Sequence, residues 1–268
     1  MFKKSGIKIL LLFLSVLVLS SCSEYNKLLK SGDYELKLTK AKEFYNIGDK
    51  KSYSRAETLL EELTRIYRAD EKAEEVLYYY AKCYYGLEMY VESEYYFGKF
   101  AQTYPRSKWA EECNFLCGYS SYLESPSASL DQSDSKNTIE YMLLFIRKFP
   151  NSTYVLQCND IIDEMRDKLV EKSYISAKLY YNMGEFKASI VALNSSINEY
   201  PETKYKEEIL FLILKSYHNL AINSVISKQK ERHQSTVDQY FALVEEFPET
   251  TYLKEAQKYY NNALLQLK

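Results

Sequence analysis

Glycine, proline and histidine are scarce in this sequence. Its 268 residues include seven Gly, five Pro and two His. So little Gly and Pro disfavours turn-rich all-β folds and Gly-rich phosphate-binding loops, and it favours an all-α protein. With histidine only at His218 and His233, little is left for histidine-based catalysis or metal binding. The near balance of 35 basic and 37 acidic residues argues against a basic nucleic-acid binder.

Motifs for catalysis and cofactor binding are also lacking. The sequence contains no P-loop, dinucleotide fingerprint, GxSxG or HExxH motif. Paired acids such as Glu61-Glu62 are adjacent, so they point about 100° apart on a helix and cannot readily form a two-carboxylate site. We interpret His218 as structural or solvated, and His233, which lies in a charged run, as part of a solvated helix face or loop. We therefore predict a protein that is not an enzyme, with no cofactor and no metal site.

Long apolar runs are missing except at the N-terminus, which has the pattern of a lipoprotein signal peptide. Three lysines in the first eight residues precede an apolar run from Ile9 to Leu19 that is too short to span a bilayer. The tetrapeptide Leu-Ser-Ser-Cys that ends at Cys22 then resembles a bacterial lipobox. We predict cleavage after residue 21 and acylation of Cys22. Because Ser23 follows rather than Asp, we expect the outer membrane as destination. An ordinary signal peptide with a chance Cys is the alternative.

Four further cysteines are predicted to be small buried apolar residues. An oxidising periplasm would allow disulfides between them. Two of them lie four residues apart on one predicted helix, and helix geometry usually prevents such a pair from joining. The four are Cys83, Cys113, Cys117 and Cys158.

One six-residue phrase recurs four times after residue 100. It consists of an aromatic residue, Pro, a variable residue, Ser or Thr, another variable residue and a second aromatic. Each phrase predicts that a helix ends at the first aromatic residue, that Pro stops it and that Ser or Thr N-caps the next helix. The spacings of 45, 51 and 47 residues indicate a helical repeat. The phrases begin at Tyr104, Phe149, Tyr200 and Phe247.

The repeats predict an all-α chain, an α-solenoid of about five TPR-like helix pairs with a C-terminal capping helix at about 251–267. The second repeat fits the 34-residue pattern best, with Ala81 on its first helix and Phe97 on its second. We expect a signal peptide over 1–21, a lipid-anchored linker over 22–30 and the solenoid over 31–268. The polar insertion at 125–135 is expected to be mobile.

The first helices of the first three repeats share a pattern on the expected concave face. Four positions of each first helix face this surface in TPR repeats. In the first two repeats they hold an acid, an apolar residue, Lys and Tyr, in that order. In the third repeat, aromatic residues follow the acid. Aromatic residues beside Lys suit a peptide with apolar side chains and a carboxylate. The alternative is that the tyrosines pack between repeats. The predicted substrate-peptide groove comprises Glu35, Leu38, Lys42, Tyr45, Glu75, Tyr78, Lys82, Tyr85, Glu112, Phe115, Tyr119 and Tyr122.

The lipobox, the repeats and the chain length together resemble the BamD family of lipoproteins of the outer-membrane β-barrel assembly machinery. The resemblance covers nearly the whole chain. It is most specific in the phrase from Phe149 to Tyr154 and in the stretch from Tyr174 to Thr203. The insertion that ends near Asp134 is also similar to that family.

This resemblance implies a lipid-anchored subunit on the periplasmic face of the outer membrane. Its N-terminal repeats would receive unfolded outer-membrane protein substrates, whose terminal signals often end in an aromatic residue, and this agrees with the predicted groove. Its C-terminal repeats would dock on POTRA domains of the barrel-forming insertase, beside other subunits of the complex. The docking contact would lie in the fifth repeat and around Tyr181, Glu185, Phe186 and Tyr205.

One departure from the family concerns this docking surface. Well-known members carry an Arg in the second helix of the fourth repeat for an ion pair with the insertase. The aligned residues here, Ile190 to Asn194, contain no Arg. Two other interpretations stay open: a periplasmic TPR lipoprotein that coordinates cell-wall synthesis with envelope constriction, and a glycan-binding helical lipoprotein.

Overall fold

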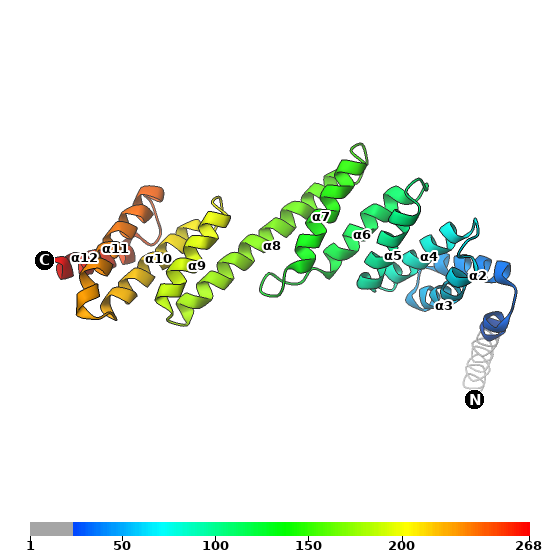
Figure 1. Ribbon diagram of the computed structural model, residues 1–268, viewed down its shortest axis with the longest axis horizontal. Coiled ribbons are helices and arrows are strands. Elements are labelled where there is room, and N and C mark those ends of the chain that lie inside the picture. Colours follow the sequence, from blue (N-terminus) through cyan, green and yellow to red (C-terminus); the bar gives the residue numbers. More distant parts are fainter. Residues whose placement is uncertain (1–23) are drawn as a thin grey trace, which may run out of the picture. The chain divides into compact units, whose positions relative to one another are not determined.

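A computed structural model describes residues 24–268 (Figure 1). A short helical stretch at 24–30 precedes the longer helices, and the described residues contain no strand. The longer helices are α2 (Tyr34–Ile47), α3 (Lys50–Ile66), α4 (Ala73–Gly86), α5 (Tyr90–Thr103), α6 (Ala110–Glu124), α7 (Ser133–Lys148), α8 (Val155–Asn182), α9 (Phe186–Glu199), α10 (Lys206–Ile222), α11 (Ile226–Glu246) and α12 (Leu253–Leu267). The predicted signal peptide and Cys22 lie outside the described residues.

The helices pack in sequence order as antiparallel pairs. Helix α2 packs on α3, α4 on α5, α10 on α11, and α12 packs on both α10 and α11. Packing also continues from one pair to the next, between α3 and α4, α5 and α6, and α9 and α10. This arrangement of helix pairs with a final helix confirms the all-α, TPR-like fold class that the repeats predicted.

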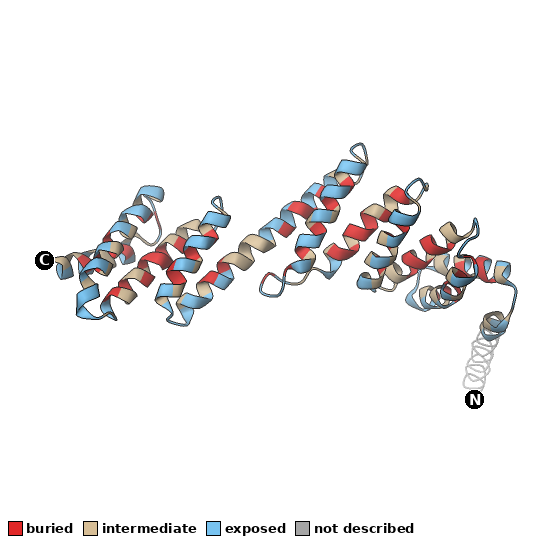
Figure 2. Cartoon of the chain, viewed as in Figure 1, coloured by how far each residue is buried: buried red, intermediate tan, exposed pale blue. Residues whose placement is uncertain are grey.

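The chain divides into two compact units, which we describe separately. Of the described residues, unit 1 comprises 24–124 and 140–158, and unit 2 comprises 125–139 and 159–268. Each has its own buried core, and buried residues line the inward faces of the paired helices (Figure 2). In unit 1 the core includes Leu60 and Leu63 of α3, and in unit 2 it includes Leu193 of α9 and Ile213 of α10.

A glycine allows two helices of unit 1 to approach closely. A Cβ added to Gly118 on α6 would lie 2.8 Å from the Cβ of Tyr141 on α7, which is nearer than real Cβ contacts. A hydroxyl pair marks another close approach, because Ser93 of α5 and Ser120 of α6 are both buried and their Oγ atoms lie 2.9 Å apart. Ser189 and Ser216 make the corresponding contact in unit 2, at 3.1 Å.

The recurring phrases end helices as predicted, but their Ser or Thr acts differently from the prediction. Helices α5, α7, α9 and α11 all end within two residues of the phrase's Pro. The Ser or Thr side chain does not cap the following helix. Its oxygen accepts a hydrogen bond from the backbone N–H of the second aromatic residue, as in the 3.0 Å bond from Trp109 to Ser107. The same bond recurs in the other three phrases, at 3.1–3.2 Å. The residue therefore stabilises the turn and sets the position of the aromatic ring.

The insertion after α6 makes hydrogen bonds within itself and to α8. The buried Gln132 donates from its side-chain nitrogen to the carbonyl of Ser127 at 2.8 Å. Lys172 of α8 donates to the carbonyl of Ser129 at 2.7 Å, and Lys168 bonds Ser125. These bonds satisfy backbone groups that lack helical partners.

The four described cysteines are free and buried, as predicted. Burial raises the pKa of the Cys83 and Cys117 thiols to about 12 and that of Cys158 to about 11. Such thiols stay protonated and unreactive near neutral pH.

The prediction for His233 was wrong. Its side chain is only 2% exposed, although charged residues surround it in the sequence. The charged neighbours occupy the outer faces of α11, and His233 falls on the face that packs against α10. His218 of α10 is buried as well, with its ring centroid 4.7 Å from that of Tyr259 on α12.

Candidate functional site

The charged residues of the predicted groove form ion pairs between successive repeats. Lys42 of α2 lies 2.6 Å from Glu75 of α4, and Lys82 of α4 lies 2.7 Å from Glu112 of α6. In each case the Lys of one first helix meets the acid of the next first helix. The Lys and the acid recur at the same positions of successive first helices, and these positions face each other when the repeats stack.

Glu112 accepts hydrogen bonds from two groove residues of the preceding repeat. Its carboxylate accepts hydrogen bonds from Lys82 Nζ at 2.7 Å and from the Tyr78 hydroxyl at 2.8 Å. Burial and this hydrogen bond raise the pKa of Tyr78 far above its ordinary value. Burial alone would lower the pKa of Lys82, but its contacts with Glu112 and Tyr45 outweigh that effect and raise it. Both groups therefore keep their protons at neutral pH.

A stack of two aromatic rings joins successive repeats at four places. The second aromatic residue of each phrase lies face to face with an aromatic residue of the preceding first helix. The centroids are 4.2–4.6 Å apart and the ring planes lie within 12° of parallel. Such stacking adds to the apolar burial between repeats. The pairs are Tyr78–Trp109 and Phe115–Tyr154 in unit 1, and Tyr174–Tyr205 and Phe211–Tyr252 in unit 2.

These contacts divide the twelve predicted groove residues into two groups. Leu38, Tyr78 and Phe115 are buried, at 5%, 9% and 4% exposure, so they pack between helices. The other nine are partly or fully exposed. Among these, Tyr119 and Tyr122 of α6 have ring centroids 5.5 Å apart, and Tyr85 of α4 interacts with Tyr119. Tyr45 of α2 stands at the same repeat position as Tyr85 and Tyr122 and is half-buried as well, and we call these four residues the tyrosine row (Tyr45, Tyr85, Tyr119 and Tyr122).

Unit 2 repeats the same arrangement, and the sequence interpretation missed it. Lys178 of α8 lies 2.7 Å from Glu208 of α10, and Lys215 of α10 lies 3.5 Å from Glu255 of α12. Hydrogen bonds to Glu208 and Tyr174 raise the pKa of Lys178. The signal was present, because Glu171, Tyr174, Lys178 and Tyr181 have the same spacing as Glu75, Tyr78, Lys82 and Tyr85.

The residues predicted for insertase docking lie in unit 2, and their exposure differs. Glu185 is exposed just before α9, and Tyr181 of α8 is partly buried against Phe186, with 6.1 Å between centroids. Tyr205 stacks on Tyr174, so one of its faces is covered. An exposed apolar group lies near these residues in the sequence and was not predicted: Leu179, Met183 and Val191.

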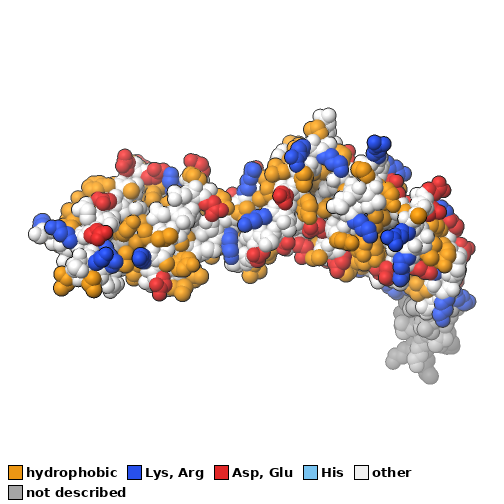
Figure 3. All heavy atoms as spheres, viewed as in Figure 1, with side chains coloured by type: hydrophobic (Ala, Val, Ile, Leu, Met, Phe, Trp, Pro, Cys, Tyr) orange, Lys and Arg blue, Asp and Glu red, His pale blue; other side chains and the backbone are white. Residues whose placement is uncertain are grey.

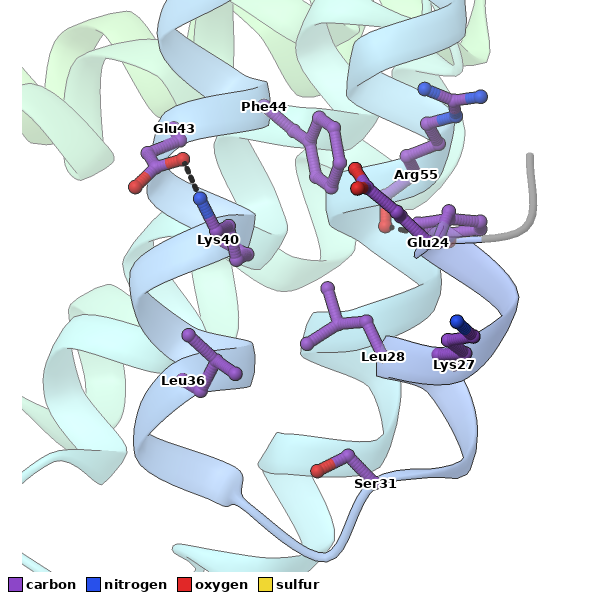
Figure 4. Close-up of a pocket in the computed structure, with 10 residues that line it drawn as sticks. Glu24, Lys27, Leu28, Ser31, Leu36, Lys40, Glu43, Phe44 and Arg55 are labelled. Atoms are coloured by element: carbon purple, nitrogen blue, oxygen red, sulfur yellow. Dashed lines mark hydrogen bonds and ion pairs between the residues drawn. The ribbon is translucent and has the colours of Figure 1, made fainter. Parts of the chain in front are cut away.

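Unit 1 also contains a pocket that the sequence interpretation missed (Figure 4). It has a volume of about 510 Å³ and lies between the helical stretch 24–30, α2 and α3. On α2 it is lined by Leu36, Lys40, Glu43 and Phe44. The groove residues of α2, Glu35, Leu38, Lys42 and Tyr45, lie on the other side of that helix, because each residue turns about 100° from the last. The pocket and the tyrosine row are therefore separate surfaces.

Neither a metal-binding cluster nor a membrane-spanning helix occurs in residues 24–268. No group of three or more His, Cys, Asp or Glu side chains is placed to hold a metal ion. None of the helices in this part of the chain combines the length and the apolar composition that a membrane span requires.

Comparison with known proteins identifies relatives. The family model "YfiO: Outer membrane lipoprotein" matches residues 38–233. A protein of Aquifex aeolicus, provisionally named outer membrane protein assembly factor BamD, is 24% identical over 88% of this chain and 76% of its own length. The outer membrane protein assembly factor BamD of Caulobacter vibrioides is 21% identical over 47% of this chain and 41% of its own length.

A solved structure also matches over much of the chain. It is the complex of the TPR2AB domain of yeast Sti1 with pHSP90, at a TM-score of 0.39 and 13% identity, and the match covers 86% of this chain and 98% of that one. At this TM-score the likeness carries no argument about the fold, which stands on the helix pairs themselves.

Proposed function

The chain belongs to the YfiO family of outer membrane lipoproteins, which includes the BamD assembly factors, and from this premise we propose that it acts in β-barrel assembly by binding rather than by catalysis. Unit 1 receives unfolded outer-membrane protein segments, and unit 2 docks on the POTRA domains of the barrel-forming insertase. Acylated Cys22 holds the protein on the periplasmic face of the outer membrane.

The tyrosine row is the observation that carries the substrate-binding proposal. Its four rings are partly exposed, and they come from three successive first helices of unit 1. A row of half-buried rings offers contact area for apolar and aromatic side chains of an extended chain at low cost in side-chain entropy. The lysines beside it are already paired with glutamates, so we assign recognition to the rings rather than to a free cation.

Peptide binding to the tyrosine row is tested with a peptide that ends in an aromatic residue. Replacing Tyr85 and Tyr122 with Ser removes two rings, and we expect binding to weaken by roughly 30-fold or more, because each aromatic contact at an interface contributes on the order of 1–2 kcal/mol. The same substitution at Tyr95, an exposed residue of α5, is the matched control. If binding to the double variant equals binding to the control, the row is not the substrate site. Circular dichroism verifies that both variants keep their helicity.

The docking proposal rests on unit 2. Glu185 is exposed beside the half-buried rings of Tyr181 and Phe186, and exposed apolar side chains follow on α8 and α9. Apolar residues next to a charge are typical of a protein–protein contact. Replacing Glu185 with Lys is expected to reduce recovery of the insertase, and replacing the exposed Glu249 in the same unit with Lys is not. Equal recovery with both variants would place the contact elsewhere.

A further inference from the structure

The pocket of unit 1 has an apolar floor. Leu28, from the stretch 24–30, and Leu36 and Phe44, from α2, point into the space between the two helices (Figure 4). Leu36 is 43% exposed there, and Leu28 and Phe44 are partly buried. Exposed aliphatic surface in a concave site is costly in water, so the floor suits an apolar group.

The rim of the pocket carries cations. The guanidinium of Arg55 lies 5.1 Å from the ring centre of Tyr25 and 5.6 Å from that of Phe44. Between residues 24 and 268 no carboxylate forms an ion pair with Arg55 or with Lys27, whereas Lys40 is paired with Glu43 at 2.6 Å. Glu24 is the remaining acid of the rim. The guanidinium of Arg55 therefore presents several N–H donors and a positive charge next to the apolar floor, and this geometry suits a phosphate group.

The short distance in sequence between the pocket and Cys22 indicates which ligand the pocket binds. Glu24, which lines the pocket, is two residues from Cys22. A chain spans at most about 3.5 Å per residue, so the pocket begins within about 7 Å of the anchored residue. With Cys22 acylated, this places the pocket at the headgroup layer of the leaflet. We infer that it binds a phospholipid of that leaflet, with the phosphate on Arg55 and the first methylenes of one acyl chain over Leu36 and Phe44.

This inference goes beyond the proposed function, because the pocket lies on the opposite side of α2 from the tyrosine row. A bound phospholipid would add a second membrane contact to the covalent anchor and would hold the stretch 24–30 against the bilayer. A peptide carboxylate would also satisfy Arg55. Proximity to the anchor favours lipid, and a peptide is an outcome that the experiment separates.

The experiment uses the full lipidated protein in phosphatidylcholine vesicles containing phosphatidylglycerol with a photoactivatable acyl chain. Cross-linked sites are mapped by mass spectrometry. We expect cross-links at residues 24–31 and on α2. Replacing Arg55 with Gln is expected to reduce them about tenfold, as for a lost charge-assisted hydrogen bond. Replacing Leu36 with Ser is expected to reduce them several-fold. Control variants in unit 1 are Arg65→Gln on α3 and Leu156→Ser on α8, both at exposed positions.

Several results would overturn the inference. Cross-links that are equally strong in the Arg55 and Leu36 variants and in their controls would mean that the segment is merely near the membrane. Displacement of the lipid by an excess of an aromatic-ended peptide would assign the pocket to peptide. Displacement by inorganic phosphate alone would reduce it to an anion site. Circular dichroism identifies any variant that fails to fold. If one of the Arg55 and Leu36 variants fails, the cross-linking of the other tests the inference. Loss of peptide binding in the tyrosine-row variant would leave the lipid cross-linking results and their interpretation unchanged.

Discussion

At the scale of single residues, Glu112 shows how one acid can hold two repeats together. It accepts bonds from Lys82 and Tyr78, and both donors are largely shielded from water. Replacing Glu112 with Ala removes the acceptor of both hydrogen bonds, so we expect the free energy of unfolding to fall by about 1–3 kcal/mol. Denaturant unfolding measures the change. The same substitution at Glu61, an exposed acid of α3, should cost much less, and an equal cost would show that the inter-repeat pair contributes nothing specific.

The two histidines give unit 2 a dependence on pH. Burial lowers the pKa of both, and for His218 the neighbouring His233 and Lys258 lower it further. The Nδ1 atoms of both have no hydrogen-bond partner. Since the unfolded chain takes up protons at about pH 6.5 and the folded chain only at lower pH, stability is full above that value and falls as the pH drops through it.

Denaturant unfolding between pH 7.5 and 5.5 checks this dependence. We expect the parent protein to lose stability across the interval, and a variant with Gln at 218 and 233 to lose less. Carboxylates with lowered pKa values, such as Glu208, titrate mainly below this window and are common to both proteins. Parallel curves for the two proteins would show that the histidines do not contribute.

At the scale of helices, the close approach of α6 and α7 depends on Gly118. A methyl group there would lie 2.8 Å from the Cβ of Tyr141, which is backbone-attached and cannot rotate away. We therefore expect Gly118→Ala to destabilise unit 1 by about 1–3 kcal/mol, even though Ala favours helix. Gly32, which has nothing within 4 Å, is the matched control. Thermal unfolding of both variants makes the comparison, and a Gly118 variant as stable as the Gly32 variant would refute the close approach.

Helix order and helix ends were predictable from the sequence, because Pro acts locally. Each phrase stopped a helix within two residues of the predicted place. The partners of the aromatic residues were not predictable. Trp109 stacks on Tyr78, 31 residues earlier, and such a contact depends on how two helix pairs stack. A second copy of the Lys–Glu spacing at Lys178 could have been found by comparing all repeats.

Burial was harder to predict where composition was misleading. His233 lies in a charged run yet is buried, because helical geometry places only every third or fourth residue on the packed face. The polar insertion at 125–135 accepts hydrogen bonds from Lys168 and Lys172 of α8, far along the chain, and composition gives no sign of such partners. The pocket near Arg55 was also missed, since it forms only when the stretch 24–30 lies against α2 and α3.

At the scale of the whole molecule, the two units have separate cores and only one contains tryptophan. Trp109, the single tryptophan, lies in unit 1. We expect Leu243→Ala, which opens a cavity in the core of unit 2, to cost about 2–5 kcal/mol there. It should lower the midpoint of part of the circular dichroism transition and leave the Trp109 fluorescence midpoint in place. Coincident shifts of both signals would mean that the chain unfolds as one cooperative unit.

The view of the whole molecule as an assembly subunit is tested most directly by its partners. The measurement is a gentle solubilisation of the outer membrane, recovery of the lipidated protein through a C-terminal tag, and identification of what accompanies it. Our account predicts a roughly stoichiometric β-barrel protein with POTRA domains, with less of it recovered by the Glu185→Lys variant. Recovery of cell-wall synthases or transport proteins, with no such barrel, would contradict it.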